Sequence, residues 1–191
     1  MKSIDIPLLT ICGIEELPRH GARAVTHVLS ILDPEREAIE AFETFTSHHR
    51  VTLRFHDDIA PLPGRVTPQP EHIVEILRFG DGLGGDGGES HLLVHCHMGV
   101  SRSTAAMLTL MAQANPGEDA DSLFRRLVAI RPQAWPNSRM IGFADAQLGR
   151  GGALVAALRR HYGRQLVARP EFRIWMTDLG RQAELEMATP A

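Results

Sequence analysis

The most informative part of this 191-residue chain is the run Val94-His95-Cys96-His97-Met98-Gly99-Val100-Ser101-Arg102-Ser103. Residues 90–96 form a short apolar run of the kind found in buried parallel strands. Residues 103–114 are rich in Ala, Leu and Met and contain no helix breaker. The run therefore predicts a strand, a tight loop and a helix, with a cysteine before the loop and an arginine where the helix begins.

The loop opens on a helix N-terminus, where backbone N–H groups lack partners inside the helix and the peptide dipoles favour negative charge. Gly99 permits the sharp backbone path that turns these donors inward. Arg102 adds a planar guanidinium that can bind two phosphate oxygens side by side. We therefore predict a phosphate-binding loop made of His97, Met98, Gly99, Val100, Ser101 and Arg102.

The same geometry predicts a reactive thiol at Cys96. A helix N-terminus favours the thiolate form of a cysteine, which is the nucleophilic form. Ser103 can offer its hydroxyl group to the sulfur, and His95 can support the loop through hydrogen bonds from its ring. The alternative is that Cys96 is a small buried core residue beside a surface arginine.

The pattern His-Cys-x5-Arg-Ser between a strand and a helix resembles the signature of the cysteine-dependent protein tyrosine phosphatases, in particular the small dual-specificity-like branch. Pro136-Asn137-Ser138 is similar to the segment that follows the phosphate loop in these enzymes, although Asn137 also suits a simple helix N-cap. The resemblance extends from about residue 26 to residue 148. It implies catalysis by Cys96, Arg102, Ser103 and an upstream carboxylic acid.

In the resembling family, the acid is an aspartate on a loop just past a strand. Apolar residues alternate from Val51 to Phe55, and the alternation continues in phase to Asp57. Asp57 is therefore the predicted proton donor to the leaving group, and Asp58 is the near alternative. Both aspartates could instead only cap a turn before Pro61.

Four apolar runs predict strands at residues 8–11, 27–32, 51–55 and 92–96, and periodic stretches between and after them predict helices. The predicted class is α/β, with a central, mostly parallel sheet of four to five strands flanked by helices on both faces. The predicted helices cover residues 34–46, 71–79, 103–114 and 153–167, with two more capped by Asp119 and Asn137.

The domain prediction is a phosphatase domain at residues 1–168 and a docked helical extension at residues 169–191. In the extension, one helix face should carry Phe172, Trp175, Met176 and Leu179. Residues beyond Arg181 are expected to fray. The glycine-rich segment 81–89 should be a flexible surface loop.

Composition narrows the class of partner. A net charge of −3 argues against a general nucleic-acid or membrane-surface binder. The two cysteines form no disulfide framework, and core packing is the expected use of Cys12. No apolar run approaches a membrane span and no signal peptide is recognised, so we expect a cytoplasmic protein. The ten histidines are scattered, and neither a metal nor a cofactor is expected.

The resemblance implies a phosphatase that hydrolyses phosphotyrosine, with phosphoserine and phosphothreonine as further substrates, through a cysteinyl-phosphate intermediate. Its partner would be a phosphorylated protein or peptide, and the oligomeric state stays open. Two alternatives remain: a rhodanese-like sulfurtransferase, which has no use for the upstream aspartate, and a non-catalytic phosphopeptide-binding module, which needs Arg102 but no nucleophile.

Overall fold

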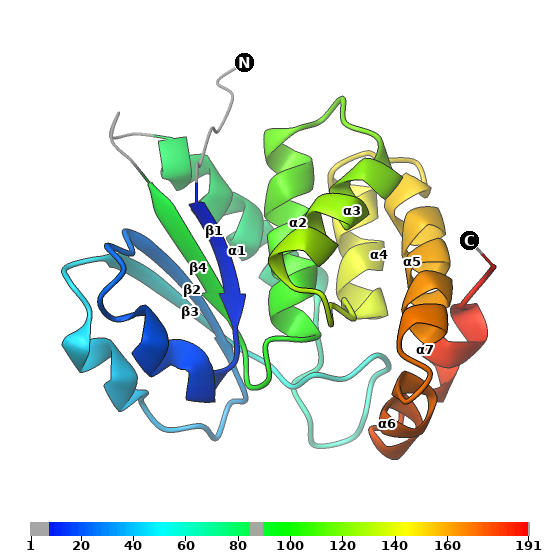
Figure 1. The fold of residues 1–191 in the computed structure, drawn as a ribbon, viewed down its shortest axis with the longest axis horizontal. Helices are drawn as coiled ribbons and strands as arrows, with labels where there is room; N and C mark the ends of the chain where they lie inside the picture. The colour runs from blue at the N-terminus through cyan, green and yellow to red at the C-terminus, as the bar shows by residue number, and fades with distance from the viewer. Residues whose placement is uncertain (1–7, 85–89, 191) are drawn as a thin grey trace.

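A computed structural model describes residues 8–84 and 90–190 of the protein. A four-stranded, fully parallel sheet lies at its centre, with the strand order β1-β4-β2-β3 (Figure 1). The strands are β1 (Leu8–Cys12), β2 (His27–Leu32), β3 (His49–Arg54) and β4 (His91–His95). All four coincide closely with the predicted strands, so the α/β class is confirmed.

β4 occupies a central place in the sheet, and every residue in it is buried. The strand has a covered face on each side, which explains why its sequence is a continuous apolar run rather than an alternating one. In the register of the sheet, His95 lies beside Cys12 of β1 and Ser30 of β2. The carboxyl ends of β1 and β2 therefore flank the point where β4 leads into the loop.

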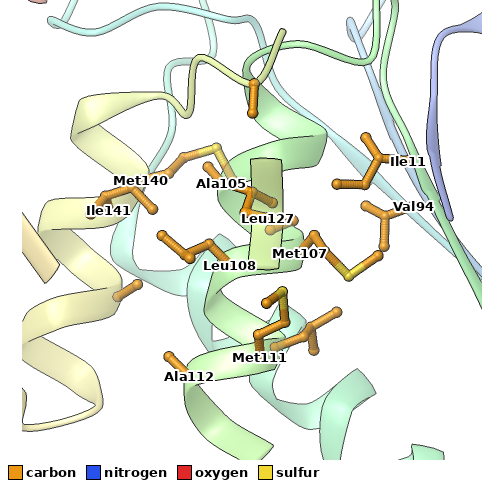
Figure 2. Close-up of a cluster of buried hydrophobic side chains, with 14 of the residues drawn as sticks. Ile11, Val94, Ala105, Met107, Leu108, Met111, Ala112, Leu127, Met140 and Ile141 are labelled. Carbon is orange, nitrogen blue, oxygen red and sulfur yellow. The ribbon is translucent and has the colours of Figure 1, made fainter. Parts of the chain in front are cut away.

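One face of the sheet carries the α-helices, with α2 (Arg102–Ala114) nearest the strands (Figure 1). The others in this layer are α1 (Pro70–Asp81), α3 (Ala120–Ile130), α4 (Ser138–Gln147) and α5 (Ala153–Ala168). Figure 2 shows that Met107 of α2 points toward Ile11 and Val94 of the sheet, while Leu108 points toward Ile141 of α4. Because α2 is packed on both sides, the start of this helix is held firmly in place.

The other face is covered by two short 3₁₀ helices, η1 (Ile14–His20) and η2 (Glu40–Thr44). They enclose a small apolar cluster made of Cys12, Leu17, Val25, Val28, Phe42 and Leu93. Cys12 is a packing residue there, as expected, and burial raises the pKa of its thiol to about 12.

The prediction of a long helix over residues 34–46 is wrong, since only η2 forms in that region. The guanidinium of Arg54 donates to the carbonyls of Asp33, Pro34 and Arg36 at 3.2, 3.3 and 2.7 Å. These carbonyls are acceptors that the first turn of a helix would need. Asp33 directly precedes the predicted helix and has a side chain that could cap it, but this side chain pairs with Arg102.

The predicted caps further along the chain are confirmed. Asp119 accepts from the backbone N–H of Ser122, and Asn137 accepts from that of Met140, each at 3.0 Å. The predicted end of α1 is wrong, because the helix passes through Gly80 to Asp81. A Cβ at Gly80 would lie 2.0 Å from Oε1 of Gln113, so this glycine permits close packing of α1 on α2.

Two further helices follow α5, namely α6 (Phe172–Asp178) and α7 (Gln182–Met187). Arg181 and Glu184 are buried, so the expected fraying beyond Arg181 is wrong. Phe172 and Met176 are buried as predicted, whereas Leu179 is 51% exposed. The division of the chain at residue 168 stays a prediction.

Part of the predicted glycine-rich loop, residues 85–89, lies outside the described residues, and Gly82–Gly84 forms a 3₁₀ turn. Within the described ranges, no helix has both the length and the apolar character needed to cross a membrane.

Candidate active site

Cys96 directly follows β4, and the loop from His97 to Ser101 connects it to the first residue of α2. This loop borders a cavity of about 270 Å³ at the carboxyl edge of the sheet. The cavity is lined by Asp57, Asp58, Arg65, Cys96, His97, Met98, Val100, Ser101, Arg102, Trp135, Trp175, Met176, Leu179 and Arg181. The structure thus brings the predicted nucleophile, arginine and both candidate acids to one cavity.

The carbonyl groups of the loop are all held by donors outside it. His97 O accepts from Ile14 N at 3.0 Å, Met98 O and Gly99 O accept from the Arg131 guanidinium at 3.0 and 2.9 Å, and Val100 O accepts from Trp135 N at 2.9 Å. In a planar trans peptide, the next N–H group points opposite to the carbonyl. The N–H groups of residues 98–101 therefore face the concave side of the loop, as an anion site requires.

The tight path of the loop depends on Gly99. Its φ angle is +70°, and a Cβ there would lie 2.4 Å from the carbonyl carbon of Cys12. Gly13, which follows β1, also lies close to the loop, since a Cβ on this residue would lie 2.9 Å from His97 O. Sequence reasoning identified Gly99 but missed Gly13, because only the sheet topology brings the two backbones together.

Cys96 is 2% exposed, and its Sγ lies 3.2 Å from Oγ of the fully buried Ser103. The hydroxyl group predicted to assist the sulfur is therefore next to it. His95 is anchored on the neighbouring strand, where Nε2 lies 2.7 Å from Oγ of Ser30. Burial lowers the pKa of His95 to about 4, so its ring is neutral at pH 7. The contact with Ser30 fixes the end of β4 directly before the loop.

Arg102 is 3% exposed and is fixed along one edge. Its Nη1 donates to Oδ1 of Asp33 at 2.6 Å and to the carbonyl of Phe55 at 2.5 Å. Its buried Nε has no hydrogen-bond partner among the described residues. A buried N–H without a partner is costly, and an anion in the cavity would satisfy it.

Asp57 lies where the carboxyl end of β3 meets the loop. Its Oδ1 accepts from Ser101 Oγ at 2.8 Å and from Asn137 Nδ2 at 3.0 Å, and it pairs with Arg181 at 2.6 Å. Burial alone would raise the pKa of Asp57, but the charges of Arg181 and Arg102 and the two hydrogen bonds outweigh burial and lower it. The carboxyl group is therefore ionised at neutral pH in this geometry.

Asp58, the alternative acid, also lines the cavity. Its Oδ2 accepts from Nε of Arg65 at 2.7 Å, and its backbone carbonyl accepts from Asn137 Nδ2 at 3.2 Å. Asn137 thus holds both aspartates while it caps α4. Which aspartate is the acid stays open, because each is paired with an arginine.

Sequence reasoning missed Arg181, which contacts both the loop and the predicted acid. In addition to the ion pair, its Nη2 donates to the backbone carbonyl of Asp57 at 2.7 Å and to Ser101 Oγ at 3.2 Å. Its Nη1 pairs with the buried Glu184 at 3.2 Å. In the sequence, Arg181 is an arginine beside a helix, and no local pattern indicates that it pairs with Asp57.

Across residues 8–84 and 90–190, the structure gathers no group of three or more His, Cys, Asp or Glu side chains that could hold a metal ion.

Comparison with known proteins supplies a relative for this arrangement. No protein-family model matches the chain. Protein phosphatase Slingshot homolog 3 of Homo sapiens is 31% identical over 155 residues, which make up 81% of this chain and 20% of that protein. The chain thus spans about a fifth of the length of the curated relative that it matches.

Solved structures show the same fold at low sequence identity. A mouse protein described as a dual specificity phosphatase has a TM-score of 0.57 and 20% identity, covering 79% of this chain and 87% of that one. Human DUSP28 has a TM-score of 0.55 and 18% identity, with 74% and 94% coverage. The human tyrosine phosphatase-like serine/threonine/tyrosine-interacting protein has a TM-score of 0.56 and 17% identity, with 76% and 93% coverage.

The parallel sheet, the loop before α2 and these neighbours define an α/β protein with the dual-specificity phosphatase fold. Over 81% of its length the chain is similar in sequence to a protein phosphatase, and its fold is similar to that of dual-specificity phosphatases.

Proposed function

We propose that the chain is a metal-independent phosphatase that hydrolyses phosphotyrosine monoesters through a cysteinyl-phosphate intermediate. The observation that carries this proposal is the buried Nε of Arg102, which has no hydrogen-bond partner among the described residues, in a side chain that lines the same cavity as Cys96. The inward N–H groups of the loop supply further donors. A tetrahedral dianion satisfies both sets of donors at once.

In the first step, the thiolate of Cys96 attacks phosphorus, so that an S–P bond forms while the ester O–P bond breaks. The carboxylic acid protonates the departing oxygen, and Arg102 with the loop amides stabilises the equatorial oxygens. In the second step, water attacks phosphorus and gives a proton to the carboxylate. The S–P bond breaks, inorganic phosphate forms, and the Ser103 hydroxyl group stabilises the returning thiolate.

The proton donor must be neutral before the first step. Asp57 is ionised without substrate, but a phosphate dianion beside it would raise its pKa, since like charges favour the protonated form. The carboxylate of Asp57 therefore takes up a proton when the substrate binds. Asp58 is the alternative donor, because it lines the same cavity.

The proposed substrate is a phosphorylated protein or peptide, with phosphoserine and phosphothreonine as further candidates. The human relative is a protein phosphatase by name, which supports this substrate class. The loop also lacks the lysines that phosphatases of inositol lipids tend to place there. A catalytic thiolate needs a reducing compartment, which supports a cytoplasmic site of action.

Hydrolysis of an aryl phosphate in the presence of a chelator tests the proposal. Wild-type protein should release phosphate, and Cys96→Ser should lose the activity while still binding inorganic phosphate. Full activity in Cys96→Ser, or loss of wild-type activity on chelation, contradicts the proposed mechanism.

A binding module is the second candidate function, because one structural neighbour is named a phosphatase-like interacting protein. Such a module needs the anion site around Arg102 but not Cys96. Tight binding of a phosphopeptide by a wild-type protein that turns over none of it would favour this alternative. Persulfide formation from thiosulfate would instead favour the sulfurtransferase.

A further inference from the structure

The C-terminal helix α6 forms one wall of the cavity that holds the phosphate-binding loop. Trp175 and Met176 of this helix and Leu179, which follows it, line the same cavity as Cys96 and Arg102. These residues lie outside the segment that resembles the phosphatase family, which ends near residue 148.

The wall is fixed to the rest of the protein at both of its ends. At its start, the buried Phe172 packs edge-on against Trp135 and Trp175, with ring centroids 5.9 and 5.1 Å apart. Trp135 in turn stacks on Tyr162 of α5 at 4.2 Å. At its end, the backbone N–H of Arg181 donates to the carbonyl of Met176 at 2.8 Å. The wall is therefore built before a substrate arrives.

Two large apolar side chains beside this polar site remain exposed. Leu179 on the wall is 51% exposed, and Met98 on the loop is 48% exposed. Both line the cavity that contains Arg102 and Cys96. An aromatic ring attached to a bound phosphate would cover apolar surface of this kind, and contacts between methionine sulfur and aromatic rings are favourable. The alkyl carbon of a phosphoserine is too small to do so.

A second phosphate on the substrate is not favoured by the charges around the cavity. Each arginine in its lining is already paired with a carboxylate. The pairs are Arg65 with Asp58 at 2.7 Å, Arg102 with Asp33 at 2.6 Å, and Arg181 with Asp57 at 2.6 Å. An aromatic monoester therefore fits the lining better than a polyphosphorylated head group does.

We propose that Leu179 and Trp175 are specificity-determining residues that hold the aromatic ring of a phosphotyrosine side chain against the C-terminal wall. This inference rests on the proposed function, because it assigns the substrate class of the same cavity. Phosphate binding is assigned to the loop, and recognition of the leaving group is assigned to α6 and Leu179.

The test is binding of two peptides of identical sequence, one with phosphotyrosine and one with phosphoserine, to Cys96→Ser protein, which cannot turn them over. In the Cys96→Ser protein, the additional substitution Leu179→Ala should weaken binding of the phosphotyrosine peptide roughly fivefold, because the leucine side chain no longer covers the tyrosine ring. Affinity for the phosphoserine peptide and for inorganic phosphate should stay within about twofold, because neither reaches the wall. Ile174→Ala is the matched control, since this α6 side chain is 70% exposed and is not part of the lining.

Equal affinity of Cys96→Ser for both peptides, or equal effects of Leu179→Ala and Ile174→Ala, would overturn the inference. Trp175→Ala provides a second variant, whose fold is checked by thermal unfolding. Hydrolysis by the wild-type protein is measured separately. An inactive wild type that still prefers the phosphotyrosine peptide through Leu179 refutes the proposed catalysis but not the specificity wall.

Discussion

Arg181 and Asp57 form an ion pair at 2.6 Å, although they are separated by 124 positions in the sequence. The pair joins the segment between α6 and α7 to Asp57, whose carboxylate also accepts from Ser101 of the loop before α2. Arg181 therefore acts as a positioning residue, which holds the predicted acid and lowers the pKa of its carboxyl group.

Replacing Arg181 with methionine should move the pH dependence of kcat/KM. Asp57 must be protonated to act as the acid, so activity falls as pH rises through its pKa. Without the cation, the ionised form of Asp57 is less stable and its pKa rises. The alkaline limb of the profile should therefore shift to higher pH. Loss of one partner from a mostly buried pair should also lower the free energy of unfolding by about 3 kcal/mol.

The groups that face Asp57 are Arg181, Arg102, Ser101 and Asn137, with Glu184 and Tyr162 behind Arg181. Arg173→Met is the matched control, since Arg173 is an exposed residue of α6. An alkaline limb that stays in place in Arg181→Met would mean that Asp57 is not the acid.

The two candidate acids can be separated by Asp57→Asn and Asp58→Asn. If Asp57 is the donor, Asp57→Asn should lower kcat for a phosphotyrosine peptide about 100-fold, the usual size of general acid catalysis. The loss should be much smaller for para-nitrophenyl phosphate, because its leaving group departs without a proton. Steady-state kinetics with both substrates measure this contrast, and the opposite ranking of the two variants would assign the role to Asp58.

Gly99→Ala should disrupt the phosphate-binding loop. The positive φ angle and the close approach to Cys12 should together cost at least about 2 kcal/mol of unfolding free energy. Inorganic phosphate binding should fall with it, as measured by urea unfolding and calorimetry. Gly142→Ala is the control, since Gly142 lies in α4 with open space around it and should gain about 0.5 to 1 kcal/mol. A fully stable Gly99→Ala that binds phosphate normally would contradict this account of the loop.

Two buried histidines should make the protein sensitive to acid. Burial lowers the pKa of His95 and of His161 to about 4, whereas an unfolded histidine titrates near 6.5. The unfolded chain therefore binds more protons between these values, and stability is full above about pH 6.5 and falls toward pH 4. Each histidine should contribute a loss of about 1.4 kcal/mol per pH unit inside this window.

Urea unfolding at several pH values between neutral and acidic checks this slope. In His161→Gln the amide can still donate to the carbonyl of Ala134, which His161 contacts at 2.8 Å. That variant should lose about half of the histidine contribution. An unchanged slope would show that His161 does not cause the acid sensitivity.

The strands could be predicted because buried parallel strands have a local signature, a short apolar run such as residues 92–96. The caps at Asp119 and Asn137 are local for the same reason, since each side chain accepts from an N–H three positions away. The strand, loop and helix around Cys96 followed from one continuous stretch of sequence.

Features that depend on distant segments could not be predicted. Asp33 has a side chain suited to an N-cap, but it forms an ion pair with Arg102 instead. Arg54 donates to backbone carbonyls that the expected helix would have needed as acceptors. The alternation along β3 brought Asp57 to the cavity but gave no sign of Arg181. The specificity wall depends on where α6 packs, which no local pattern in its own sequence reveals.

The ion pair between Arg181 and Asp57 has a consequence for biosynthesis. A ribosome makes the chain from its N-terminus, so Arg181 is added on the order of ten seconds after Cys96. During this interval the nascent chain already carries Cys96, the loop before α2 and Asp57, but not the cation that neutralises the carboxylate of Asp57. The ion pair that neutralises Asp57 therefore forms late in translation, when the segment between α6 and α7 has emerged and docked.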